Sequence, residues 1–129
     1  MKKTSKPTDA ELDILNVLWK KGPSTVREVH EEIQLHKSLG YTTILKQMQI
    51  MVEKGLLTRD TSKRTHVFQP AVSQDSTQKG LVSRLMDAAF GGSATKLVMQ
   101  ALGNRKTSAE ELDQIRALLD ELESKQKKV

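Results

Sequence analysis

One short segment in the first half of the chain carries hydrogen-bonding side chains of several kinds. Lys46 has a cation that can bond to a guanine acceptor or to a phosphate, and Gln47 has an amide that can pair with adenine through two hydrogen bonds. Thr42 and Thr43 can meet a thymine methyl group, and the hydroxyl of Tyr41 can donate to a phosphate. These groups could read DNA, or they could form an ordinary solvated helix face.

A second group of cations comes from other segments of the chain. Lys63 and Arg64 lie in a polar stretch that follows Arg59, where they could contact phosphates or simply discourage pairing at a sheet edge. We favour phosphate contact, because it would extend the surface begun by the first group. Arg27 could contact the DNA backbone, but an ion pair with Glu31, four residues later, is equally plausible.

Three amphipathic helices are predicted to position these residues. Capping boxes that start at Thr8 and Thr25 begin the first two helices, and the third begins near Tyr41. Gly22 ends the first helix and Gly55 ends the third. The predicted apolar positions are Leu12, Leu15, Leu18 and Trp19 in the first helix, Val26, Val29 and Ile33 in the second, and Ile44, Met48 and Met51 in the third.

A hairpin is predicted after the third helix, because the apolar period changes there. Residues 56–60 and 65–69 suit strands, residues 61–64 suit the turn between them, and Pro70 closes the pair. Three helices followed by a hairpin describe a winged helix-turn-helix, in which the third helix enters the major groove of DNA. This order of elements favours DNA reading over the solvated-face alternative.

The second half of the chain is predicted to hold three helices, capped by Ser73, Ser93 and Ser108 and separated by Gly91-Gly92 and Gly103-Asn104. Each helix has a single apolar stripe, and a unit this small rarely buries enough surface alone. We therefore expect it to pair with a second copy of the chain. The predicted dimerisation residues are Val82, Leu85, Leu97, Leu112, Ile115, Leu119 and Leu122.

The predicted fold class is mainly α with a small β-hairpin. Residues 1–70 would form an N-terminal winged-helix DNA-binding domain that begins with a basic arm over residues 1–7. Residues 71–129 would form a C-terminal three-helix dimerisation domain with a frayed basic tail from Lys125. The charge distribution fits this division, because residues 1–70 hold 12 Lys and Arg against 8 Asp and Glu, within a chain of net charge +5.

Composition excludes several other functions. The chain has no cysteine, which excludes a disulfide framework, a zinc finger and a Cys nucleophile. Its three histidines, His30, His36 and His66, lack metal-ligand spacing, so we expect surface histidines and no metal site. We find no G-x-S-x-G motif and no phosphate-cradling glycine loop, and predict no enzyme activity and no cofactor. The lack of a signal peptide or apolar span favours a cytoplasmic protein with no membrane insertion.

Several stretches together resemble the penicillinase-repressor family of bacterial transcription factors, of the BlaI/MecI/CopY type. They are residues 18–29 (LWKKGPSTVREV), 41–45 (YTTIL), 53–57 (EKGLL), 90–93 (FGGS) and 108–112 (SAEEL). The ordered set is specific, although no single stretch is diagnostic. The resemblance implies a dimeric repressor with an N-terminal DNA-binding domain and a C-terminal helical dimerisation domain.

Two departures from the family pattern bear on regulation. The lack of cysteine excludes the thiolate metal site of some copper-responsive members. In the β-lactam-responsive members an Asn-Phe bond is cleaved, and the matching place here is Gln100-Ala101. The resemblance therefore implies a derepressing partner, but leaves open whether it is a membrane sensor protease or another factor.

We predict a sequence-specific repressor that occupies a palindromic promoter operator as a homodimer. The alternative is a winged-helix adaptor in a transcription or replication complex, whose third helix would face protein. An adaptor should carry apolar residues on the exposed face of that helix, and only Ile50 leans this way. The polar face and the cationic hairpin favour DNA.

Overall fold

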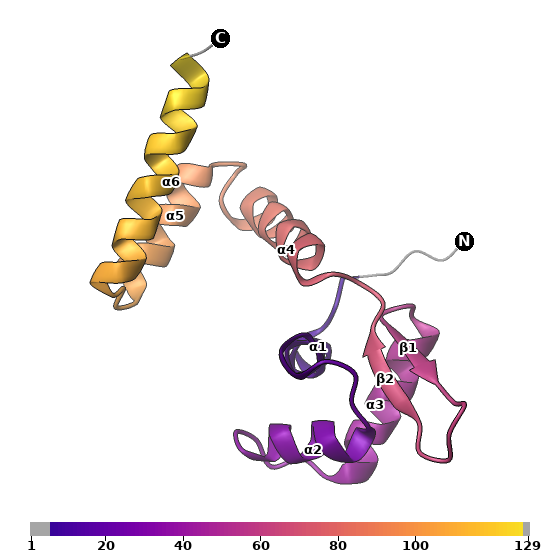
Figure 1. Cartoon of the computed structure of the whole chain (residues 1–129). Coiled ribbons are helices and arrows are strands. Elements are labelled where there is room, and N and C mark those ends of the chain that lie inside the picture. The colour runs from indigo at the N-terminus through magenta and orange to yellow at the C-terminus, as the bar shows by residue number, and fades with distance from the viewer. Residues whose placement is uncertain (1–5, 128–129) are drawn as a thin grey trace. The chain divides into compact units, whose positions relative to one another are not determined.

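The computed structural model describes residues 6–127, which form six helices and one two-stranded hairpin (Figure 1). The elements are α1 (Asp9–Lys21), α2 (Val26–Gln34), α3 (Tyr41–Glu53), β1 (Leu57–Asp60), β2 (Val67–Pro70), α4 (Gln74–Ala89), α5 (Ala94–Asn104) and α6 (Ala109–Lys127). The chain divides into an N-terminal unit up to Val82 and a C-terminal unit from Ser83. Predictions for residues 1–5 and 128–129 lie outside the described residues.

The predicted capping boxes begin their helices as expected. The Thr8 hydroxyl accepts a hydrogen bond from the Glu11 amide at 3.2 Å, and the Glu11 carboxylate accepts one from the Thr8 amide at 2.9 Å. Thr25 and Glu28 form the same reciprocal pair ahead of α2, at 3.1 and 2.9 Å. These local contacts satisfy backbone amides that a helix start leaves without partners.

The hairpin is attached to the helices through its second strand. β1 pairs antiparallel with β2, with Leu57 opposite Pro70 and Arg59 opposite Phe68. Ser24, just ahead of α2, exchanges two backbone hydrogen bonds with Phe68, at 3.0 and 2.8 Å. β2 begins two residues later and ends one residue later than the predicted 65–69. It includes Pro70, because the proline sits at the strand end and Ala71 continues the bonding to the Leu56 carbonyl.

The core of the N-terminal unit draws on every element from α1 to β2. Its buried side chains are Ile14, Leu15, Leu18, Val26, Val29, Ile33, Ile44, Met48, Met51, Leu56, Leu57 and Phe68. Trp19 packs against this core, and its indole N–H donates to the Val72 carbonyl at 3.1 Å. The segment after the hairpin is thereby tied to α1.

Replacing Leu15 with Ala should lower the free energy of unfolding of this unit by roughly 2–5 kcal/mol, because it leaves a cavity in a packed core. Urea unfolding followed by the fluorescence of Trp19, the chain's single tryptophan, measures the change. Leu35→Ala is the matched control, because that leucine is 71% exposed. Equal effects of the two substitutions would contradict the assignment of the core.

The helices after the hairpin differ from the earlier ones in burial: none of the described residues in α4, α5 or α6 is buried. α5 includes Gly103 and ends at Asn104, so the break between α5 and α6 falls just after the predicted Gly103-Asn104 pair. An interior glycine costs a helix only about 1 kcal/mol relative to alanine, which allows this extension. α6 also continues to Lys127 where a frayed tail was predicted, with Lys125 paired to Glu121 at 3.7 Å.

Candidate nucleic-acid interface

α3 presents a polar face opposite its buried one. Ile44, Met48 and Met51 point into the core. At about 100° per residue, the outward side of the helix carries Thr42, Lys46, Gln49 and Glu53, with Ile50 beside them. The first four side chains are exposed, as is Thr43, and Ile50 is 37% exposed. The side chains of Thr42, Thr43 and Lys46, all predicted to bind DNA, are therefore accessible to a ligand.

Gln47 lies elsewhere on α3 than the sequence analysis supposed. Its amide donates to the carboxylate of Glu11 in α1 at 3.3 Å, and its side chain is half-buried. This contact occupies the group that was expected to pair with adenine. Gln49, which we did not select, is the glutamine on the outward side, and careful helical phasing could have identified it.

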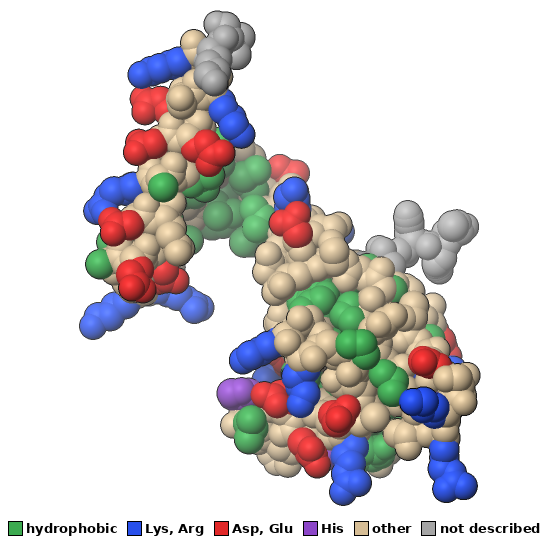
Figure 2. All heavy atoms as spheres, viewed as in Figure 1, with side chains coloured by type: hydrophobic (Ala, Val, Ile, Leu, Met, Phe, Trp, Pro, Cys, Tyr) green, Lys and Arg blue, Asp and Glu red, His purple; other side chains and the backbone are tan. Residues whose placement is uncertain are grey.

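A groove separates the outward side of α3 from the hairpin and the start of α2. Arg27 of α2, Tyr41 and Gln49 of α3, and Arg59, Arg64 and His66 of the hairpin segment contribute to its lining. Figure 2 shows Lys and Arg side chains projecting from the N-terminal unit at the end where the hairpin loop lies. Such a groove offers hydrogen-bond donors and positive charge to an anionic ligand.

The hairpin loop presents its cations without neutralising partners. Lys63 and Arg64 are exposed, and among the described residues neither forms an ion pair within 4.0 Å. The Asp60 carboxylate accepts a hydrogen bond from the Ser62 amide at 2.9 Å. That bond holds the pKa of Asp60 below its usual value, with smaller contributions from Lys63 and His66. Asp60 thus supports the turn as a carboxylate.

Arg27 forms the ion pair that was its alternative prediction. Its guanidinium lies 3.6 Å from the Glu31 carboxylate, and the Arg27 side chain is 81% exposed. An ion pair so exposed is worth at most about 1 kcal/mol, so exchanging it for a phosphate is inexpensive. The structure is therefore compatible with both roles of Arg27, the ion pair with Glu31 and a contact with phosphate.

Tyr41 is positioned by a histidine. The rings of His30 and Tyr41 meet edge to face, with centroids 5.9 Å apart. The imidazole Nε2 of His30 donates to the Leu39 carbonyl at 2.8 Å, and the residue is half-buried. The prediction that His30 is an ordinary surface histidine is thus wrong, because its ring packs between α2 and the start of α3. No cluster of three potential metal ligands occurs within residues 6–127.

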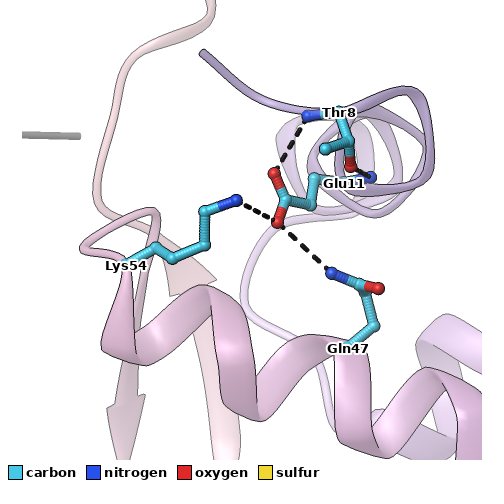
Figure 3. Close-up of polar contacts among 4 residues, drawn as sticks. All are labelled: Thr8, Glu11, Gln47 and Lys54. Carbon is cyan, nitrogen blue, oxygen red and sulfur yellow. Dashed lines mark hydrogen bonds and ion pairs between the residues drawn. The ribbon is translucent and has the colours of Figure 1, made fainter. Parts of the chain in front are cut away.

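The inward flank of α3 is joined to α1 through Glu11 (Figure 3). This carboxylate is only 1% exposed and lies 2.7 Å from the ammonium of Lys54, close to the amide of Gln47. The sequence pattern predicts only the capping box that starts at Thr8, of which Glu11 is the last residue. Its other partners lie 36 and 43 residues along the chain, and no local pattern indicates contacts of that range.

Comparisons with known proteins identify relatives along almost the whole chain. The sequence model described as Penicillinase repressor matches residues 7–121. The chain is 31% identical over 126 residues to the transcriptional regulator BlaI of Mycobacterium tuberculosis, covering 96% of this chain and 90% of that protein. It is 24% identical over 127 residues to the penicillinase repressor of Bacillus licheniformis, covering 98% and 99%.

Two solved structures resemble the chain, each at 28% identity. One is the solution structure of the DNA-binding domain of the repressor BlaI, with a TM-score of 0.51 over 57% of this chain and 90% of that one. The other is the monomeric form of Bacillus licheniformis BlaI in complex with the blaP half-operator, with a TM-score of 0.50 over 58% and 92%. The predicted winged-helix fold is confirmed.

Proposed function

The chain belongs to the penicillinase-repressor family, and we propose that it represses transcription by occupying a palindromic promoter operator as a homodimer. The observation that carries this proposal is the pairing of a polar, outward α3 face with a groove bordered by three arginines. A similar structure holds an operator half-site, which supports the same partner, double-stranded DNA, for this chain. Such a protein would act in the cytoplasm, where bacterial promoters lie.

Each part of the interface has a distinct role in this proposal. α3 would enter the major groove, where Thr42, Lys46 and Gln49 face base edges. Lys63 and Arg64 of the hairpin loop would contact phosphates beside it, which fixes the position of α3 but conveys no sequence information. Repression follows from occupying promoter DNA and excluding polymerase, so it requires binding and no catalysis.

The C-terminal unit supports a dimer through its uncovered apolar side chains. Leu119 is 59% exposed, Leu85 51% and Leu122 47%, and Figure 2 shows such apolar side chains on this unit's surface. Val82, at the end of the N-terminal unit, is also exposed, whereas Leu97, Leu112 and Ile115 are half-buried. A unit of this size rarely forms a sufficient core alone, and a second copy presents matching stripes.

We expect a two-fold dimer to select an operator with two related half-sites, centred about 34–36 Å apart or a multiple of this. Selection from a random DNA pool with the full chain, followed by a shift assay on DNA upstream of its own gene, tests the proposal. Enrichment of an inverted repeat that also occurs in that DNA supports it. If no sequence is enriched and no DNA is shifted, the adaptor function, which the exposed Ile50 favours, replaces it.

We expect derepression to leave the Gln100-Ala101 bond intact, because the Asn-Phe pair of the β-lactam-responsive members is absent. The bond lies within α5, so a protease would also have to open the helix there. Mass spectrometry of the chain from a host with a β-lactam-responsive sensor protease, after induction, measures this. Gln100→Asn combined with Ala101→Phe is the matched variant that should become cleavable. Wild-type fragments that end at Gln100 would contradict the prediction.

A further inference from the structure

Glu11 is the only buried charged side chain among the described residues, and it lies at a junction between α1 and α3. One carboxylate oxygen accepts from the Thr8 amide at 2.9 Å. The other accepts from Lys54 at 2.7 Å and from Gln47 at 3.3 Å. In Figure 3 the three partners point towards this single carboxylate from two different elements. The first oxygen therefore caps the start of α1, and the second binds side chains from α3 and its C-cap residue.

The two partners of the second oxygen, one in α3 and one at its C-cap, lie on the same flank of the helix. Gln47 and Lys54 are seven residues apart, which is about two helical turns, so one carboxylate holds this flank at two levels. A single contact would leave α3 free to turn about it, whereas two contacts along the axis resist rotation. This flank and the outward face belong to one helix. The rotation of α3 about its axis therefore determines where Thr42, Lys46 and Gln49 point.

The burial of the Glu11 carboxylate makes this rotational position of α3 strongly preferred. A carboxylate removed from water needs charged or hydrogen-bonding partners, and leaving it unpaired is strongly unfavourable. Small rotations of α3 that break the contacts with Lys54 and Gln47 therefore meet a steep energetic penalty. Apolar packing of Met48 and Met51 resists such sliding less, because methionine side chains adapt to shifted neighbours.

The geometry points to Glu11 as a positioning residue that sets base discrimination by holding the rotation of α3, without itself contacting DNA. This inference rests on the proposed function. Base-edge hydrogen bonds depend steeply on donor position, whereas phosphate contacts by long cationic side chains tolerate a shifted helix. Loosening the Glu11 contacts should therefore lower the affinity for the operator far more than the affinity for scrambled DNA.

The test compares operator and scrambled-DNA affinities of the full chain for a set of matched variants, with an operator selected by the wild type. Glu11→Gln keeps the shape and the Thr8 contact but loses the ion pair with Lys54. Asp13→Asn is the control, because Asp13 is a second α1 carboxylate that pairs with a lysine, Lys37, outside α3. Lys54→Met and Lys54→Arg form a second pair, of which only arginine keeps the cation.

We expect Glu11→Gln and Lys54→Met to lower the operator-to-scrambled affinity ratio by about tenfold, a coupling within the usual range for residues without ligand contact. Asp13→Asn and Lys54→Arg should leave the ratio within about twofold. A purely structural role predicts equal losses on both DNAs, and that result, or an unchanged ratio in a folded variant, overturns the inference. If Glu11→Gln fails to fold, the two Lys54 variants decide. A wild type without any preference would instead refute the proposed function.

Discussion

Replacing Leu119 with Asp should convert the proposed dimer into a monomer and lower operator affinity by about a hundredfold or more. Leu119 is 59% exposed in the single chain and lies in the α6 stripe that the second copy is proposed to cover. A carboxylate there would be buried without a partner, which disfavours association. Separated subunits also lose the high effective concentration that links two half-sites, an advantage of about 10²–10⁴. Light-scattering mass at micromolar concentration and operator titration measure the two effects.

The matched control for this substitution adds the same charge to the opposite side of α6. Ala117 is exposed and lies about 160° from Leu119 around the helix, so Ala117→Asp should leave the dimer intact. Urea unfolding followed by Trp19 should show an unchanged N-terminal unit in both variants. A wild-type chain that is monomeric at micromolar concentration, or a Leu119→Asp chain that remains dimeric, would contradict the proposed interface.

The parts of the fold that sequence analysis predicted well are those set by local interactions. The capping boxes at Thr8 and Thr25 depend on residues three positions apart, and both are confirmed. The apolar spacing of α3 likewise predicted that Met48 and Met51 are buried. Local rules were less reliable where penalties are small, as at Gly103, which α5 accommodates.

The contacts at the candidate interface that the sequence did not predict have a different physical origin. Gln47 and Gln49 have the same side chain, so their roles depend only on how α3 is rotated against α1. That rotation is set by contacts with Glu11, far away in the sequence. The packing of His30 against Tyr41 likewise requires α2 and α3 to be placed together. Sequence patterns therefore predicted α3 and its buried face, but not which of its flanks meets α1.

Removing the two hairpin cations, Lys63 and Arg64, together should weaken binding to all DNA about equally. If both contact phosphate, the slope of log affinity against log salt should flatten by roughly 2 per subunit, or about 4 in a dimer, since each contact releases about one counterion. Arg105 and Lys106 in the C-terminal unit offer a matched control, a neighbouring pair of exposed cations outside the proposed interface. Their replacement by Ala should change the slope much less, which separates local contact from net charge.

Substitutions on the outward face of α3 should give the opposite result. Lys46→Ala and Gln49→Ala should each lower operator affinity by roughly 1–3 kcal/mol while scrambled-DNA affinity changes less, because base-edge contacts are lost. Titrations of both DNAs at several salt concentrations measure all the variants together. A hairpin variant that changes the operator-to-scrambled ratio while the α3 variants do not would reverse the assigned roles. If none of these variants alters DNA affinity, α3 faces protein and the adaptor function should be adopted, because a DNA-reading helix cannot lose its outward polar groups without consequence.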